Sequence, residues 1–459
     1  MIKKETLETH ILIILTISIF IISLGIKLNS YFIYFFIFLF LLSFFFLYLF
    51  SRTHKSFIPD FQKLIFMKEY IAAMSALTFL YIINIKNFIY NYSCKYLIEY
   101  FHCEYYIFIL IFTFIIFLFF FLQIRFTDIR KVFIKFGLIF FFISLLNLII
   151  FYLKDLKILN IHFIFRFEGD YNFYWQFLPF ALQGQRNFEV VPFILAYISA
   201  ISLFKSKDKN YLKYIYLFFI SIFLTFSKNA WVATIVITFI TLSWKKKNLH
   251  IIKNCVFGTL IVVLLIFTFQ KYVVKKFHTN ILGYSIYKIL PNNSYKKNLF
   301  SKEYYDKFEN IYGTDRFKNA EAHLDYLLDS SASRTLIYTK TIEEIFKNPL
   351  LGQGLNAHIE IKDIRGNSIY TDNYESQILT ILIETGFVGF FIYLYIFFFS
   401  FTKIKHNKEF YITLCSGIIS LSIFNSYQRN VFIYFLLAFI FASIIKTSKI
   451  ESFNNKSEK

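Results

Sequence analysis

The sequence predicts an all-α membrane protein: a polytopic helical bundle of about twelve transmembrane helices, with one large outer loop domain between the ninth and tenth. Hydrophobic residues make up 57% of the chain, more than a soluble domain could keep away from water. They form long uninterrupted runs, such as Tyr31–Phe50 and Tyr105–Leu122. A helix needs about 20 apolar residues to cross the bilayer core, whereas barrel strands would show alternating segments of about ten. The runs therefore favour helices.

Twelve runs have the length and hydropathy expected of a span. They cover residues 11–28, 31–50, 70–90, 105–124, 132–153, 188–204, 211–227, 230–244, 251–269, 373–402, 409–425 and 431–446. The stretch Asp170–Gln185 is shorter and mixed, and Pro179 interrupts it. Counting it as a span would place every later basic loop outside, so we expect it to lie at the outer membrane surface.

Lysine and arginine residues concentrate in alternate loops. The loops on the side of the N-terminus carry 25 of them, and the short loops on the other side carry nine. Cytoplasmic loops are enriched in basic residues. The pattern therefore predicts cytoplasmic termini and an outer loop at residues 270–372. The net charge of +20 reflects this topology, and we expect no nucleic-acid partner.

This topology divides the chain into five parts. They are residues 1–187, with the first five helices and the interfacial segment; 188–269, with helices six to nine; 270–372, the outer loop; 373–446, with the last three helices; and 447–459, a cytoplasmic tail. Cys94 and Cys103 share one predicted outer loop, and the sequence is compatible with either a disulfide or two free thiols there.

The second half of the outer loop predicts an ordered helix. Hydroxyl side chains between Ser330 and Ser333 suit its N-cap. A helically spaced stripe follows, and Asn348-Pro349 would end the helix. The members of the stripe are Leu336, Ile337, Thr341, Ile345 and Phe346.

Two basic clusters fall on the predicted outer side. Ser227 and Lys228 lie in a tight turn between two spans, where a lysine usually extends to lipid headgroups but also suits a phosphate. Arg334 lies at the start of the loop helix. It is either a solvated surface residue or an anion ligand, because arginine and a helix N-terminus both bind phosphate.

A third cluster lies where the loop re-enters the membrane. Gly352 and Gly354 permit a tight turn, and Asp372-Asn373 opens the next span. The acid and amide suit a helix N-cap, and Asp372 also suits a catalytic carboxylate. Glu384 would lie about 18 Å into a continuous helix that starts at this point.

Two glycines, Gly386 and Gly389, follow this predicted intramembrane acid closely. An intramembrane acid is costly and is a functional candidate by default. Gly386 and Gly389 offer an alternative to the continuous helix, because they could break it and leave Glu384 in a polar pocket between two shorter helices.

Taken in order, these motifs resemble the O-antigen ligase and O-antigen polymerase superfamily. They are Ser-Lys-Asn-Ala-Trp from Ser227, Ser-x-x-Arg ending at Arg334, Asn-Pro-Leu-x-Gly-x-Gly from Asn348, Asp-Asn-Tyr from Asp372 and Glu-Thr-Gly-x-x-Gly from Glu384. The resemblance extends over roughly Leu217–Phe399. Twelve spans and one large outer loop after the ninth are also similar to that family.

The resemblance implies a glycan transferase of the bacterial inner membrane. Such enzymes move a glycan from undecaprenyl diphosphate to an acceptor hydroxyl on the periplasmic side, without a metal or cofactor. It implies that Lys228 and Arg334 bind the diphosphate and that Asp372 is the general base. Binding roles are expected for Ser227, Asn373, Glu384, Arg186 and Arg429.

Two positions depart from the family pattern. Lys228 stands where arginine is usual, and Asp372 stands where the ligases have histidine, which favours a polymerase over a lipid A–core ligase. The expected partners are the lipid-linked glycan, an acceptor glycan or lipid A–core, membrane lipids, a chain-length regulator and a flippase.

Other functions stay open at the level of the sequence. A protein O-oligosaccharyltransferase would share the same donor chemistry. A lipid-linked glycan flippase or another transporter is the alternative from a different class. Transporters often contain two related halves, whereas here nine spans precede the loop and three follow it.

Overall fold

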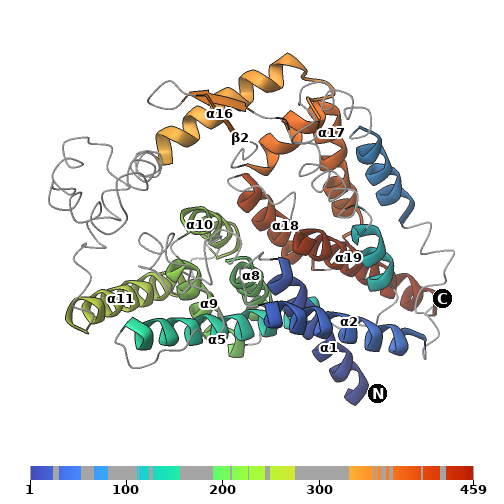
Figure 1. Cartoon of the computed structure of the whole chain (residues 1–459). Helices are drawn as coiled ribbons and strands as arrows, with labels where there is room; N and C mark the ends of the chain where they lie inside the picture. Colours follow the sequence, from blue (N-terminus) through green and yellow to red (C-terminus); the bar gives the residue numbers. More distant parts are fainter. Residues whose placement is uncertain are drawn as a thin grey trace.

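In the computed structural model of the chain (Figure 1), the described residues form helices and one small sheet. The described residues are 2–23, 30–52, 67–80, 111, 113–122, 128–155, 190–206, 209–225, 227–242, 249–273, 330–354, 357, 359–362, 368–371, 376–404, 407–423 and 431–457. The interfacial segment Asp170–Gln185 and the cysteines Cys94 and Cys103 lie outside them, so those predictions stay untested.

Each predicted span overlaps a helix of the described chain. The helices are α1 (Ile2–Ser23), α2 (Ser30–Arg52), α5 (Ile129–Asp155), α8 (Val191–Lys205), α9 (Leu212–Leu224), α10 (Lys228–Leu242), α11 (Leu249–Val273), α17 (Gln377–Thr402), α18 (Lys408–Ile423) and α19 (Val431–Ser457), with helical segments at 67–80 and 113–122. A short 3-10 turn, Lys209–Tyr211, precedes α9. Helix α19 continues well beyond residue 446, where we expect the membrane part to end.

Among the described residues, α17 alone is a helix both long and apolar enough to span a membrane by length and composition. Shorter apolar stretches occur in seven other helices of that set, among them Leu7–Ile22 and Phe432–Lys446. The count of twelve spans and the separate outer loop domain remain predictions.

The described residues are helical, as the sequence predicted, except for one small β-hairpin. Two short strands, β1 (Ile359–Lys362) and β2 (Ser368–Thr371), form an antiparallel hairpin in which Ile359 faces Thr371. The all-α prediction did not include this sheet. Both strands carry β-branched residues in a polar segment, a composition that favours a half-buried strand over a helix.

The main core is built around α8. Every residue from Val190 to Ile201 is buried, because α5, α9, α10 and α18 pack around this helix (Figure 1). Aromatic rings fill much of the remaining space. Phe20 of α1 packs edge-on against Phe136, Phe140 and Phe432, with centroids 4.9–5.5 Å apart. Such pairs add to the stability gained from burial, so the phenylalanine-rich composition serves the core.

Large apolar side chains also face outward along several helices. Phe38, Phe142, Phe239, Leu265 and Phe398 are each more than half exposed on the isolated chain. An apolar exterior of this extent is unfavourable in water and favourable against lipid. The exposed rings therefore agree with a membrane-embedded bundle.

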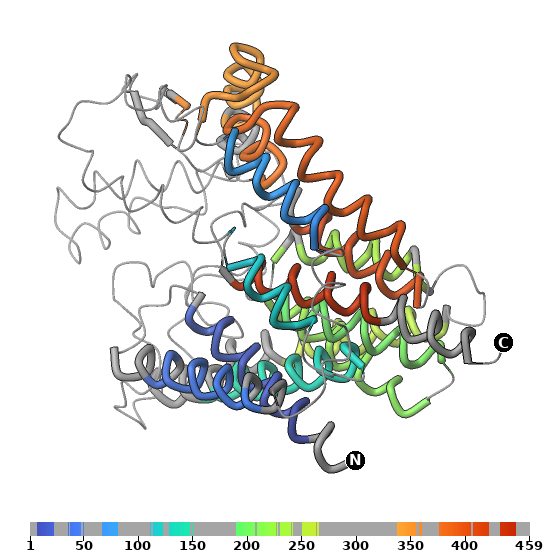
Figure 2. Tube along the Cα trace, turned by 90° about the vertical axis from the view of Figure 1, so that its right-hand side faces the viewer, coloured from blue at the N-terminus to red at the C-terminus, as the bar shows by residue number. Residues whose placement is uncertain are grey.

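A second, smaller core lies at the opposite end of the molecule from α1 and α2 (Figures 1 and 2). Helix α16 (Ser330–Lys347) packs on β1 and on the first part of α17. The buried residues of this second core are Ile337, Ile345, Ala357, Ile359 and Ile383. We call α16, the hairpin and residues 348–354 the cap. The cap is attached to α17 by an apolar core of its own.

Helix α16 confirms the predicted loop helix, from its serine-rich start to its end before Asn348-Pro349. Ile337, Thr341 and Ile345 form the expected buried stripe. Phe346 was predicted to belong to it and is instead 68% exposed. At 100° per residue, Phe346 lies a full residue step beyond Ile345 and points away from α17.

Candidate active site

Helix α17 is broken at Gly386. This residue has φ 64° and ψ −167° within an otherwise helical segment. The break bears out the alternative that the sequence left open, two shorter helices in place of a continuous one. Gly386 is the breaking residue, while Gly389 lies in the helix that follows. The first part, Gln377–Thr385, contacts the cap, and the second part joins the main core through Ile396 and Phe397.

The loop from Asn348 to Gly354 fills the break. A continuous helix would join the Phe387 N–H to the Ile383 carbonyl and the Val388 N–H to the Glu384 carbonyl. Here the Gln353 and Gly354 N–H groups donate to those two carbonyls, at 2.7 and 3.0 Å.

The donors on the other side of the break are satisfied in the same way. The Phe387 and Val388 N–H groups donate to the carbonyls of Pro349 and Leu350, at 2.8 and 3.2 Å. Each buried backbone group left unpaired would cost about 1–3 kcal/mol. The four bonds therefore make the break stable and fix the loop to α17 at the same time.

Two glycines make this close contact feasible. Gly352 has φ +75°, and a Cβ there would lie 2.5 Å from the Glu384 carbonyl carbon. A Cβ on Gly386 would lie 2.3 Å from the Leu350 oxygen. Any side chain at either position would force the two backbones apart. Gly352, the first glycine of the Gly-x-Gly, thus serves backbone packing between the loop and the helix.

Polar side chains hold the same loop to α16. The Gln353 side-chain amide donates to the Glu344 backbone carbonyl at 2.7 Å and to its carboxylate at 2.9 Å. Lys347 also donates to that carboxylate. Burial acts to raise the pKa of the Glu344 carboxyl, but the hydrogen bonds from Lys347 and Gln353 outweigh it and hold that pKa below its usual value. Gln353 thereby joins α16 to the break in α17.

Glu384 is fully buried beside the break, at 0% exposure. The expected depth of about 18 Å is wrong, because it assumed one straight helix beginning at Asn373. The helix begins at Gln377, so Glu384 lies about 10 Å along it. Its carbonyl accepts the Gly354 N–H, which places the residue at the junction of cap and bundle.

The N-cap of α17 is Ser376. Its backbone is extended, at φ −149° and ψ 127°, and its hydroxyl accepts the Leu379 N–H at 3.5 Å. The capping role that the sequence left open for Asp372 and Asn373 therefore belongs to another residue. Asp372 and Asn373 themselves lie outside the described residues, in the four-residue segment between β2 and Ser376.

Ser227 caps α10 in the turn after α9. Its hydroxyl accepts the Ala230 N–H at 3.3 Å, and its carbonyl accepts the Trp231 N–H. The indole of Trp231 donates to the Phe223 carbonyl at 3.3 Å, which closes the turn. Lys228 is the first residue of α10. The sequence predicted a binding role for Ser227, and the structure adds a capping role.

The cations expected to bind phosphate are placed only in part. Arg334 is the fifth residue of α16, and its side chain and that of Lys228 lie outside the described set. Arg186 and Arg429 lie outside it entirely. Within the described ranges, no group of three His, Cys, Asp or Glu residues is placed to hold a metal ion.

Sequence reasoning missed Ser376, Gln353 and Glu344. A signal for Ser376 existed, because a serine directly before an apolar run is a common N-cap. No sequence signal marks Gln353 or Glu344. Their importance comes from contacts that join α16, the loop and α17, and these contacts follow no sequence pattern.

A comparison with known protein families matches the part of the chain that contains the candidate site. The family model described as O-antigen ligase matches residues 214–394, from α9 into the second part of α17. No curated protein matches the chain. The matched residues include all three polar clusters and the loop that fills the break. The match confirms, over residues 214–394, the predicted resemblance to the O-antigen ligase and O-antigen polymerase superfamily.

Proposed function

We propose that the protein transfers a glycan from undecaprenyl diphosphate to an acceptor sugar hydroxyl, on the periplasmic face of the bacterial inner membrane. The family implies glycan transfer of the O-antigen ligase or polymerase type, in a membrane protein of polysaccharide biosynthesis. The observation that carries the finer proposal is that the matched region contains the two basic clusters and the Asp372 segment, in family order.

The proposed reaction is one inverting substitution. The acceptor oxygen attacks the anomeric carbon while the bond from that carbon to the diphosphate oxygen breaks. Asp372 takes the acceptor proton, and the diphosphate leaves with its lipid. Lys228 and Arg334 neutralise the charge that develops on the leaving group. Asn373, Ser227, Glu384, Arg186 and Arg429 bind the sugar or the diphosphate.

The Ser376 cap supports the role given to Asp372. A helix that is already capped by Ser376 does not need an acid four residues earlier, so N-capping does not explain the aspartate at position 372. The segment follows β2, which belongs to the cap held on the α17 break. In the sequence, Asp372 comes directly after β2, and β2 belongs to the same cap as α16, the helix that carries Arg334.

A polymerase is favoured over a lipid A–core ligase because aspartate replaces the usual ligase histidine. A deletion strain distinguishes the two on a lipopolysaccharide gel. A core carrying one repeat indicates a polymerase, and bare core with lipid-linked polymer indicates a ligase. Bare core with intermediates held on the inner leaflet would instead indicate a flippase. Unchanged lipopolysaccharide with an unglycosylated protein target would indicate a protein O-oligosaccharyltransferase.

The site itself is tested by Arg334→Ala and Asp372→Ala. Each is expected to abolish long-chain glycan at normal membrane abundance, since oxyanion stabilisation and general-base catalysis each contribute about 10²-fold or more. Lys340→Ala is the matched control, because Lys340 lies on α16 and pairs with Glu343 at the surface. Normal glycan ladders in both site variants would rule out this assignment.

A further inference from the structure

Helix α16 is apolar over a wider arc than its contacts with β1 and α17 cover. At about 100° per residue, the buried stripe of Ile337, Thr341 and Ile345 takes up about 80° of the helix surface. Ile342 and Phe346 extend the apolar arc by about another 100° and are 45% and 68% exposed. About half of the apolar arc therefore lies on the surface of the cap.

The charged residues in the second half of α16 lie on the opposite arc. Lys340 pairs with Glu343 at 2.6 Å, and Lys347 pairs with Glu344 at 2.5 Å. These four residues lie within about 100° of one another, and their charges cancel. A helix with one apolar arc and one charged arc suits the boundary between lipid headgroups and acyl chains. Because the charged arc has no net charge, such a helix would bind there through the apolar area that it buries.

The exposed residues of α16 continue along the chain to an exposed surface of α17. Leu350, which is 65% exposed, follows Phe346 by four positions. Its carbonyl accepts the Val388 N–H at 3.2 Å, which fixes it beside the first turn of α17 after the break. Phe387 and Val388 in that turn are 37% and 39% exposed. We call Ile342, Phe346 and Leu350 the outer cap face, and it meets the exposed side of α17 at the break.

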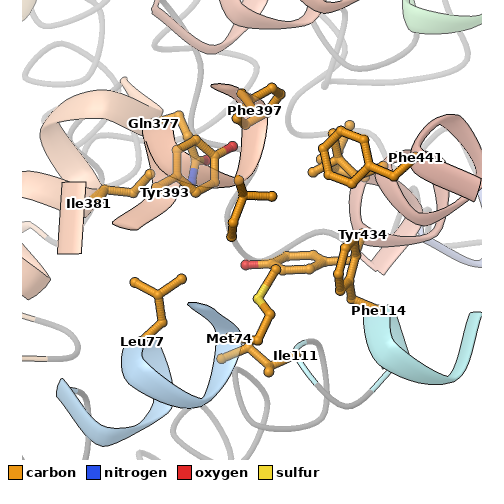
Figure 3. A pocket seen from close by; sticks show the side chains of 13 residues that line it. Met74, Leu77, Ile111, Phe114, Gln377, Ile381, Tyr393, Phe397, Tyr434 and Phe441 are labelled. Carbon is orange, nitrogen blue, oxygen red and sulfur yellow. The ribbon is translucent and has the colours of Figure 1, made fainter. Parts of the chain in front are cut away.

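After the break, α17 turns one side toward the bundle and another side away from it. Tyr393 and Phe397 line a cavity that α19 and the helical segments 67–80 and 113–122 also line (Figure 3). Phe391 and Phe398 are directed about 140–160° away from Tyr393 and are 62% and 68% exposed. Because α17 is long and apolar enough to span a membrane, we expect this exposed side to meet lipid. The outer cap face is therefore continuous with a lipid-facing surface.

The part of α17 after the break is too short to cross the bilayer core alone. Phe387–Thr402 rises about 24 Å, whereas the hydrocarbon core is about 30 Å thick. With Thr402, which precedes Lys403, at the inner edge of the core, the outer edge falls about 6 Å beyond Phe387. Leu350 is bonded at this level, and α16 lies crosswise at the same end of α17 (Figures 1 and 2). The outer cap face therefore reaches the depth at which the acyl chains begin.

We propose that the outer cap face inserts among the lipid acyl chains of the outer leaflet. Ile342, Phe346 and Leu350 lie just below the headgroups, and Lys340 and Lys347 on the opposite arc face water. The cap is then part of the membrane boundary, in place of a domain surrounded by water. Insertion of the cap does not depend on the glycan transfer proposed above.

The test is fluorescence quenching of the full chain in phosphatidylcholine nanodiscs. A fluorescent amino acid is incorporated at position 346, and the quencher is phosphatidylcholine with a doxyl spin label near the headgroup end of its acyl chain. Position 340 is the matched control, because Lys340 lies on the same helix about 120° away. We expect at least about twofold stronger quenching at position 346, since an interfacial helix buries its apolar face about 5–10 Å into the headgroup and acyl boundary. Position 350 replaces position 346 if the latter variant does not fold.

Equal quenching at positions 346 and 340 would overturn the inference, as would quenching of position 346 by iodide in the surrounding water. Protection of position 346 from both quenchers would also contradict it, because protein would then cover the face, either a second copy of the chain or another part of the same one. Quenching that appears only after phosphatidylglycerol is added would indicate attachment through charge and would exclude the apolar insertion proposed for this face.

Discussion

Positions 352 and 386 both require glycine, because the backbone of each lies too close to the other segment to leave room for a side chain. Each has a positive φ, and a Cβ on either would lie within 2.6 Å of backbone atoms on the opposite segment. Packing of this kind involves no flexible side chain that could move aside. A substitution at either position therefore has to separate the loop from the helix.

Gly386→Ala should release the loop from α17. The backbone of Gly386, at φ 64° and ψ −167°, is a conformation that essentially only glycine adopts and would cost alanine about 1–3 kcal/mol. The close approach to the Leu350 oxygen adds to that cost. We expect a lower melting temperature in detergent and loss of long-chain glycan. Gly258→Ala on α11 is the control, since its Cβ would meet Ile220 at an ordinary 3.4 Å. Equal stability of the two variants would contradict the packing described for Gly386.

Helix α16 depends on Gln353 for its polar attachment to α17. Gln353→Ala removes both side-chain bonds to Glu344 while keeping the backbone bonds to the break. The expected cost is about 1–3 kcal/mol. Hydrogen exchange of the α16 amides should accelerate, with α8 unchanged. Lys340→Ala, which removes only a surface ion pair, should leave α16 protected. Faster exchange throughout the chain would instead indicate general unfolding.

The attachment of α16 should also depend on pH. The folded pKa of Glu344 is lowered, so its contribution to stability is complete above its usual value of about 4.5 and is lost as pH falls through the folded pKa. Hydrogen exchange of α16 should therefore accelerate on acidification below that range. In Glu344→Gln this dependence should be absent or smaller. The same acid dependence in both proteins would assign the effect to another group.

The sequence was sufficient for elements whose signals are local. The serines and Asn348-Pro349 correctly bounded α16, and the glycines after Glu384 pointed to a break in α17 as the alternative to a continuous helix. The hairpin and the Ser376 cap were not predicted. Nor was the pairing of Gln353 and Gly354 with Ile383 and Glu384, because about 30 residues separate the partners and no periodic pattern links them. The positions of Asp372 and of the Lys228 and Arg334 side chains remain predictions.

At the scale of the whole molecule, three of the segments predicted to be cytoplasmic meet at one end of the bundle. Arg130, at the start of α5, pairs with Asp128 at 2.9 Å and donates to Ser202 near the end of α8. Its guanidinium also reaches Asn407 before α18, at 3.5 Å. Lys205 pairs with Glu409 in the same region. Segments assigned to one side by charge alone are therefore joined in space, which supports the alternation of the spans.

Reporter fusions would establish the side of the membrane on which each end lies. The excess of basic residues in the loops that meet at Arg130 predicts that these loops are cytoplasmic. Alkaline phosphatase joined after Lys459 should therefore be inactive, and a fluorescent protein at the same point should fluoresce. Alkaline phosphatase inserted at residue 300, in the predicted outer loop, should be active. Activity after Lys459 together with inactivity at residue 300 would invert the topology and place Arg334 on the cytoplasmic side, where a periplasmic glycan transfer could not occur.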